Sequence, residues 1–214
     1  APTQILTGPV TTLFGYATSL VGDLNGDGRS DLAVGSWLTY NIWVYLSQED
    51  GTFDEYTMLE SSPGIFPMFG HDVAPAGDIN QDGYADLITG DPIGSAGYIY
   101  FGGPNGVSPD NSLTLYAATG GGITVIGGCD IDGDGRDDAF VGGPPSLAVF
   151  ATPESSEPSQ ILEKSGGNFG VAVDCAGDTN GDGFLDIIVG AGTNNGTFVY
   201  FGGPEGLDTE AEII

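Results

Sequence analysis

One nine-residue pattern, Asp-x-[Asp or Asn]-x-Asp-Gly-x-x-Asp, recurs four times and constrains the fold more than any other feature. Its copies occupy residues 23–31, 78–86, 130–138 and 178–186. Oxygen-bearing side chains stand at positions 1, 3, 5 and 9, and the glycine at position 6 allows a sharp turn. Calcium takes six to eight oxygen ligands at about 2.3–2.6 Å. The sequence therefore predicts four calcium-binding loops.

The expected ligands of each loop are its four oxygen-bearing side chains and the backbone carbonyl of position 7. An EF-hand loop would close its site with a glutamate at position 12, but that position is valine or threonine in every copy. We therefore expect the aspartate at position 9 to complete the site. The predicted ligands of about four Ca²⁺ ions are Asp23, Asn25, Asp27, Arg29 and Asp31; Asp78, Asn80, Asp82, Tyr84 and Asp86; Asp130, Asp132, Asp134, Arg136 and Asp138; and Asp178, Asn180, Asp182, Phe184 and Asp186.

The spacing of the loops defines a structural repeat. Their first aspartates, at 23, 78, 130 and 178, are 55, 52 and 48 residues apart. Short runs of β-branched and aromatic residues, bounded by Gly, Pro and Asn, indicate one strand before each loop and three after it. No sustained 3.6-residue apolar period indicates a helix.

Four strands in a period of about 50 residues are typical of a propeller blade, whereas a β-sandwich would need no fixed period. We predict an all-β fold, a β-propeller of four blades with about four antiparallel strands each. It forms one domain over residues 1–214, with blades at about 10–60, 64–116, 119–163 and 166–214.

The candidate outermost strands do not divide evenly among four blades. Residues 2–6 repeat the pattern of residues 158–162, and residues 212–214 form a further candidate, which gives five outer strands for four blades. Residues 1–8 are therefore a candidate closing strand. Three explanations remain open: one terminal segment is surplus, the chain is part of a longer array, or a terminal strand pairs with another copy in a homo-oligomer, for example an eight-bladed ring.

The charge balance excludes several classes of partner. The chain has 30 acidic residues and three Lys and Arg, a net charge of −27. Binding to nucleic acid or to an anionic membrane surface needs basic residues, and no run of about 18 apolar residues indicates membrane insertion. Many of the aspartates stand in the metal loops, and the acidic remainder suits a secreted or extracellular protein in a calcium-rich exterior.

Two cysteines, Cys129 and Cys175, precede the third and fourth loops. Equivalent strands would place both side chains on the same side. They either form a disulfide between neighbouring repeats or pack as two small buried hydrophobes.

The loops opposite the metal sites contain candidate ligand-binding residues, Trp37, Tyr40, Phe66 and Met68. Exposed aromatic side chains there would suit stacking on sugars or anchoring a protein partner; the alternative is that they pack within the blades. His71 is the only histidine, and no nucleophile or acid–base constellation surrounds it in the sequence, so we do not expect an enzyme.

Motifs beyond the loops resemble those of a known family. Phe-Gly opens three repeats, at residues 14–15, 69–70 and 169–170, and Tyr-Phe-Gly-Gly-Pro ends two, at 100–104 and 200–204. Together with the Gly-Asp-x-Asn-x-Asp-Gly-x-x-Asp loops, these motifs resemble the FG-GAP repeat of integrin α-subunit propellers and of related secreted bacterial and fungal propellers. The resemblance implies calcium between the first and second strands of each blade, on the face opposite the usual ligand face.

Two features depart from the family pattern. The third repeat has glycines in place of Phe-Gly, and integrin propellers have seven blades, of which only some bind calcium. The resulting hypothesis is a secreted adhesion or recognition module with structural Ca²⁺ and a protein or glycan ligand. The alternatives are a lectin-like carbohydrate-binding propeller and an accessory domain or fragment of a larger secreted protein or enzyme.

Overall fold

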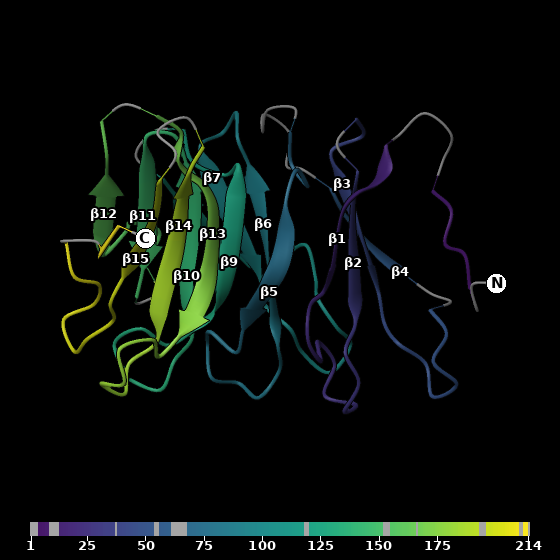
Figure 1. Ribbon diagram of the computed structural model, residues 1–214. Helices are drawn as coiled ribbons and strands as arrows, with labels where there is room; N and C mark the ends of the chain where they lie inside the picture. Colours follow the sequence, from purple (N-terminus) through teal and green to yellow (C-terminus); the bar gives the residue numbers. More distant parts are fainter. Residues whose placement is uncertain are drawn as a thin grey trace.

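The computed structural model describes residues 4–8, 13–36, 38–53, 56–60, 68–117, 120–151, 155–165, 167–192, 196–209 and 212–213. These residues form sixteen β-strands in four antiparallel sheets (Figure 1). The described part of the chain contains no helix that is long and apolar enough to cross a membrane. The predicted all-β propeller architecture is confirmed.

Each sheet is one blade whose strands are hydrogen-bonded in the order of the sequence. Blade 1 contains β1 (Phe14–Leu20), β2 (Leu32–Ser36), β3 (Asn41–Tyr45) and β4 (Tyr56–Glu60). Blade 2 contains β5 (Val73–Gly77), β6 (Asp86–Asp91), β7 (Ala96–Tyr100) and β8 (Ser112–Tyr116). Blade 3 contains β9 (Thr124–Cys129), β10 (Asp138–Gly143), β11 (Ser146–Phe150) and β12 (Gln160–Glu163). Blade 4 contains β13 (Phe169–Gly177), β14 (Asp186–Ala191), β15 (Gly196–Tyr200) and β16 (Glu212–Ile213).

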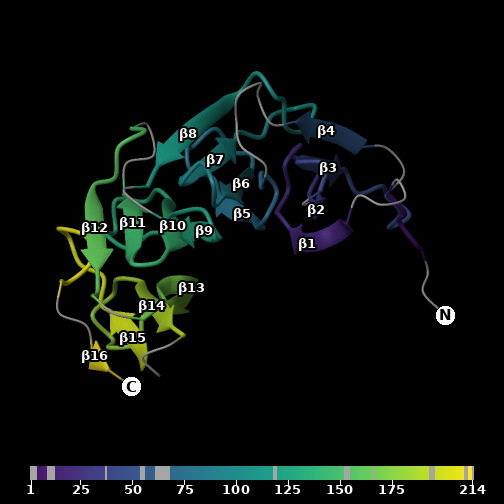
Figure 2. The same ribbon diagram turned by 90° about the horizontal axis from the view of Figure 1, so that it is seen from above.

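The four blades stand side by side in an open arc (Figure 2). The first strands of the blades, β1, β5, β9 and β13, line its inner side, and each contacts the first strand of the next blade. Blades 1 and 4 form the two ends of the arc and lie apart from each other. The four blades therefore do not close into a ring in this structure.

The core lies between successive blades because their middle strands are buried on both faces. Successive side chains of a strand point to opposite faces: Leu87 of β6 packs in the apolar cluster shared with blade 1, and Ile88 packs in the cluster shared with blade 3. Both side chains are fully buried. Strands with two buried faces explain the continuous apolar runs in the sequence.

In blades 1, 2 and 4 the Phe-Gly phenylalanine packs on an aromatic ring of the same blade. The ring centroids lie 5.2 Å apart for Phe14 and Trp43, 5.6 Å for Phe69 and Tyr98, and 5.7 Å for Phe169 and Phe198. In blade 3 the register places Ala148 at the position of these aromatic partners. The missing phenylalanine of the third repeat is thus accompanied by the loss of its partner ring.

Candidate metal centres

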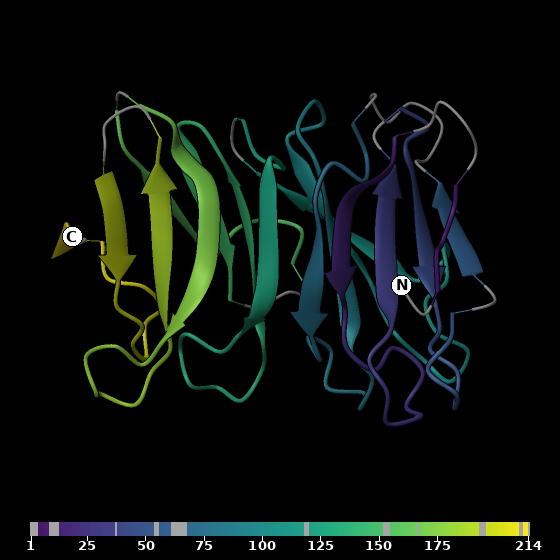
Figure 3. The ribbon, with the colours of Figure 1, turned by 45° about the vertical axis from the view of Figure 1, so that its right-hand side comes forward.

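All four aspartate loops lie on one face of the arc, at the bottom of Figure 3, in the connections between the first and second strands of the blades. Each loop begins where an inner strand ends, and its ninth residue stands beside or at the start of the second strand. The loops therefore occupy four equivalent positions on one scaffold.

The first aspartate of each loop organises the turn by accepting backbone hydrogen bonds. In the first loop, Asp23 Oδ1 accepts hydrogen bonds from the N–H groups of Gly26 at 2.7 Å and Asp27 at 3.0 Å. Its Oδ2 accepts one from Gly28 at 2.6 Å. Gly28 has a φ of 85°, a conformation that residues with a Cβ rarely adopt, which explains the glycine at position 6. Two of the equivalent N–H groups donate to the carboxylate of Asp78 and two to that of Asp130, and all three donate to that of Asp178.

The side chains at positions 3 and 5 are held in the same way. In every loop, Oδ1 of position 3 accepts a hydrogen bond from the N–H of position 5, at 2.9–3.1 Å. Oδ1 of position 5 accepts one from the N–H of position 7, at 2.8–3.0 Å. In the three loops with asparagine at position 3, its Nδ2 donates to Oδ2 of position 5 at 2.8–3.1 Å, whereas the third loop has the carboxylate of Asp132 at position 3.

The aspartate at position 9 is fully buried in every loop and connects the loop to the rest of its blade. Its Oδ2 accepts a hydrogen bond from the N–H of position 2, at 2.7–2.9 Å. Its Oδ1 accepts one from a residue that follows the third strand: Ser47 for Asp31, Gly102 for Asp86 and Gly202 for Asp186. Oδ1 of Asp138 is the exception, because it is buried and has no hydrogen-bond partner in the described part of the chain.

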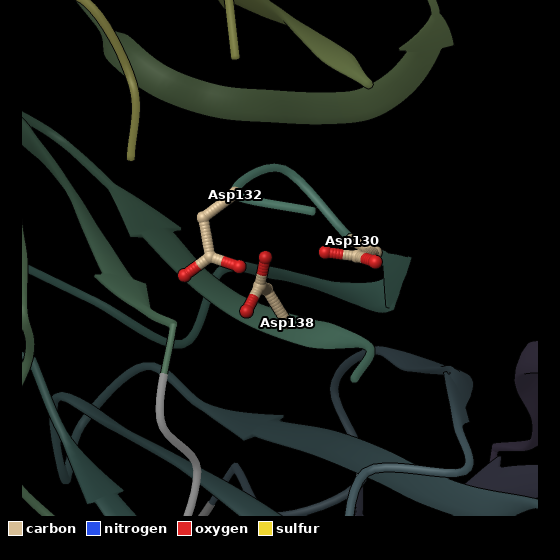
Figure 4. A group of neighbouring side chains, drawn as sticks. All are labelled: Asp130, Asp132 and Asp138. Atoms are coloured by element: carbon tan, nitrogen blue, oxygen red, sulfur yellow. The ribbon is translucent and has the colours of Figure 1, made fainter. Parts of the chain in front are cut away.

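The third loop brings three carboxylates together (Figure 4). One oxygen each of Asp130, Asp132 and Asp138 lies within 4.8 Å of the other two. Converging like charges repel one another, and a buried unpaired oxygen is costly. A divalent cation at this point would relieve both, so the donor set of the third loop fits a hard cation such as Ca²⁺.

Burial and hydrogen bonds together set the pKa values of the ninth aspartates when no cation is bound. Burial raises the pKa of Asp86 to about 7 and that of Asp138 to about 8, and it raises the pKa of Asp31 as well. At Asp186 burial also acts to raise the pKa, but hydrogen bonds outweigh it and the pKa lies below its usual value. The hydroxyl and N–H of Thr179 and the N–H of Gly202 donate those bonds.

Contacts between neighbouring loops were not foreseen from the sequence. The ring of Tyr84 lies so close to Gly26 that a Cβ there would stand 2.9 Å from it, and Phe184 has the same relation to Gly133. Between the second and third loops, Asp78 N–H donates to Asp137 Oδ2 at 3.0 Å. The two aromatic contacts pair position 4 of one loop with position 7 of the next, whereas the bond between Asp78 and Asp137 joins position 1 to position 8. Only the blade packing reveals these relations.

Arg29 also has a role that the sequence pattern does not predict. Besides its expected carbonyl, its guanidinium Nη2 lies 2.6 Å from Asp27 Oδ2, and its Nε donates to the Ser47 carbonyl at 3.3 Å. The side chain therefore partly neutralises the first loop.

Cys129 and Cys175 form a disulfide in the structure, with their Cα atoms 6.2 Å apart. It joins the end of β9 to β13, directly before the third and fourth loops. Blades 3 and 4 are thus linked covalently on the metal side.

The candidate ligand face is only partly described, because Trp37 and Phe66 lie outside the described residues. Tyr40 follows β2 at the end of the blade opposite the metal loop and packs partly buried against the cluster between blades 1 and 2. Met68 is also half-buried. The ring of His71 lies 5.4 Å from that of Tyr16, an aromatic contact between blades.

Comparison with known proteins agrees with this geometry. The FG-GAP-like repeat model matches residues 23–89 and 130–189. The chain is 34% identical to integrin alpha-7 of Homo sapiens over 164 residues, which cover 70% of this chain and 14% of that protein. It is 34% identical to integrin alpha-7 of Rattus norvegicus over 156 residues (66% and 14%), and 37% identical to integrin alpha-PS3 of Drosophila melanogaster over 107 residues (45% and 10%). It therefore spans a small part of the length of these relatives. Because the model matches more than half of the chain, this protein belongs to the FG-GAP-like repeat family.

Proposed function

We propose that this chain is a calcium-binding extracellular recognition module, a propeller in which about four Ca²⁺ ions stabilise one face and the other face binds a protein or glycan. The observation that carries the calcium proposal is the convergence of Asp130, Asp132 and Asp138 within 4.8 Å, with a buried oxygen on Asp138 that has no hydrogen-bond partner among the described residues. The same sequence pattern and the same turn hydrogen bonds support sites in the other three loops.

Each ion would be held by the side chains of positions 1, 3, 5 and 9 and the carbonyl of position 7. When bound, calcium supplies positive charge where the loop gathers carboxylates, so its binding free energy adds to the stability of the folded chain. The backbone N–H groups that donate to the first aspartate orient its carboxylate before the ion arrives. In this proposal the ions are structural and take part in no reaction.

The recognition role is proposed from the relatives, which are integrin α-subunits, and from the position of the metal loops on one face of the arc. Metal binding on that face leaves the opposite face, with Tyr40 and Met68, free for a ligand. A binding module rather than an enzyme is also consistent with those relatives.

Calcium dependence is tested by thermal unfolding in excess Ca²⁺ and in calcium-free buffer with a chelator. A ligand that binds only the folded state stabilises it by about 2.7 kcal/mol at a hundred times its Kd, so the melting temperature should rise clearly with Ca²⁺. Asp130→Asn should reduce that rise, whereas Asp208→Asn, an exposed aspartate outside the loops, should leave it unchanged. Equal melting temperatures with and without Ca²⁺ would contradict the proposal.

The ligand face is tested separately, with the calcium-loaded protein on a glycan array. Binding that Tyr40→Ala abolishes, while Asp130→Asn leaves it in place when Ca²⁺ is saturating, would assign a carbohydrate ligand to this face. Binding that survives Tyr40→Ala would place the glycan site elsewhere.

A further inference from the structure

The two ends of the arc lack the neighbouring blade that covers the corresponding blade faces elsewhere in the molecule. On blade 1, the register places Leu32 at the position of Ile187 in blade 4. Ile187 is fully buried against blade 3, whereas Leu32 and the phenylalanine Phe14 remain partly exposed. This side of blade 1, defined by Phe14, Leu20, Leu32, Trp43 and Tyr45, is named the leading face.

At the opposite end of the arc, blade 4 has no following blade packed against it. Ile188 and Val199 of blade 4 stand at the register positions of Phe140 and Val149 in blade 3. Phe140 is fully buried in the cluster between blades 3 and 4, but Ile188 is only partly buried. This side of blade 4, defined by Ile188 and Val199, is named the trailing face. Ile188 stands where the other blades present an apolar side chain to a following blade; Val199 is already buried, and the exposed Asp174 is paired with Ile188 on the same face.

The contacts of residues 4–8 indicate which structural element packs against the leading face. The Gln4 amide donates to the Phe53 carbonyl at 3.0 Å and accepts from the Phe53 N–H at 2.9 Å. Gln160 in β12 of blade 3 makes the same pair of bonds with Leu207 of blade 4, at 2.8 and 3.2 Å.

The apolar contacts of this segment repeat the same relation. Leu6 packs with Trp43 and Tyr45 of blade 1. Leu162 of β12 packs in the cluster that contains the equivalent residues of blade 4, Phe198 and Tyr200. Residues 4–8 therefore lie against blade 1 as the outermost strand of a preceding blade lies against the next one. Figure 2 shows this segment beside blade 1, on the side away from blade 2. The three inner strands of that preceding blade are not among the described residues.

We propose that a second copy of this chain supplies those strands by docking its trailing face onto the leading face of the first. The trailing face fits because it continues the same series of blade-to-blade contacts and carries Ile188 and Val199 at the required register. The two faces are different surfaces, so the contact is heterologous, head to tail, and two copies joined twice would form a ring.

The docking has a consequence for the outermost strand of the joined blade. In blade 4, Val199 pairs with residue 212 of β16, as Val149 pairs with Gln160 of β12. Residues 4–6 of one copy and β16 of the other therefore belong to the same strand position. Residues 4–6 already hold their place through Gln4, and β16 is displaced in the joined assembly.

Light scattering of the calcium-loaded 214-residue chain over a range of concentrations tests the proposal. The expected mass at high concentration is at least twice the 21.8 kDa of one chain. Leu20→Asp, on the leading face at a side chain that is 61% exposed, and Ile188→Asp, on the trailing face, should each give monomers. Ile161→Asp, at an isoleucine that is 42% exposed on the outer strand of blade 3, is the matched control and should still associate.

Mixing the two monomeric variants separates a head-to-tail contact from a symmetric one. The leading face of Ile188→Asp and the trailing face of Leu20→Asp are both intact, so the mixture should form a 1:1 complex. A wild-type chain that stays monomeric, association that either variant leaves unchanged, or a mixture that stays monomeric would each overturn the proposal.

A cysteine pair provides a second readout that does not depend on disruptive variants. Leu20 and Gly177 stand at the register positions of Cys175 and Cys129, which are bonded between blades 4 and 3. A Cβ at Gly177 would meet nothing within 4 Å, although its φ of +73° costs some stability. The double variant Leu20→Cys, Gly177→Cys should form a reducible dimer that neither single variant forms. Absence of that dimer at concentrations where the wild type associates would overturn the proposed register.

Discussion

The third and fourth metal loops share one backbone plan and differ in how their buried aspartate is satisfied. In the fourth loop both oxygens of Asp186 accept hydrogen bonds, from Gly202 on one side and from Thr179 on the other. In the third loop Ile131 replaces the threonine, and Oδ1 of Asp138 has no partner within the described residues. The same carboxylate position is thus charged and satisfied in one loop and unsatisfied in the other.

The pKa values of the two aspartates differ as well, and burial contributes to that difference, because Asp86 accepts hydrogen bonds on both oxygens and still has a pKa of about 7. Burial raises the pKa of Asp138 to about 8, whereas the hydrogen bonds to Asp186 outweigh burial and lower its pKa. The third loop also has a fourth ligand carboxylate, Asp132, where the fourth loop has Asn180. The comparison predicts that the fourth loop is preorganised without an ion, while the third needs one to bring its carboxylates together in the ionised form.

The largest expected effect is a loss of stability with rising pH that calcium abolishes. In the metal-free protein Asp86 and Asp138, with pKa values of about 7 and 8, bind protons more tightly when folded than when unfolded, where the value is 3.8. Each contributes stability that is fully present below about pH 4 and lost as the pH rises through 7 and 8. The free energy of unfolding should therefore fall by several kcal/mol as the pH rises, since each pKa unit corresponds to about 1.4 kcal/mol.

Denaturant unfolding between pH 4.5 and 8.5 measures this effect. In calcium-free buffer stability should decline across the range, and in saturating Ca²⁺ it should not, because the ion binds the ionised carboxylates. Stability of the metal-free protein that increases between pH 6 and 8 would contradict the role assigned to the third loop.

The next largest effect is expected from replacing the ninth aspartate by asparagine in the fourth loop and in the third. Asp186→Asn replaces one acceptor oxygen by an NH₂ group that faces N–H donors, so we expect a loss of about 1–3 kcal/mol in calcium-free buffer. Asp138→Asn replaces a side chain that is neutral below pH 8 by a neutral one of the same shape, so it should change the stability of the metal-free protein little. Denaturant unfolding at pH 7 without Ca²⁺ measures both.

Calcium provides the control for this pair. Both variants should lose calcium-dependent stabilisation at their own loop, because each removes a charged ligand. Equal losses for the two variants in calcium-free buffer would mean that the unpartnered oxygen of Asp138 has no energetic consequence.

Features that arise from interactions between residues close in the sequence were predictable, and features that arise from contacts between distant residues were not. The loops and strands were predictable because they arise from local rules: glycine at a positive φ, side chains that bond the backbone two to five residues away, and apolar runs bounded by turns. The hydrogen bonds of Asp186 were not predictable from the loop pattern, since one of them comes from the N–H of Gly202, a residue after the third strand. The contact between Asp137 and Asp78 and the bonds of Gln4 likewise join different blades.

Thr179 itself was within reach of the sequence, because it is the only polar residue at position 2 among leucine and isoleucines, but the loop pattern gave that position no role. The structure assigns it one through its hydroxyl, which donates to Asp186. Thr179→Val keeps the shape and removes this donor. The pKa of Asp186 should rise, and the metal-free protein should lose about 1 kcal/mol at pH 7. Thr179→Ser, the matched control, keeps the hydroxyl and should retain the low pKa. NMR titration of the Asp186 carboxyl measures the shift, and a Thr179→Val variant with an unchanged pKa would show that the backbone donors alone keep the fourth loop charged.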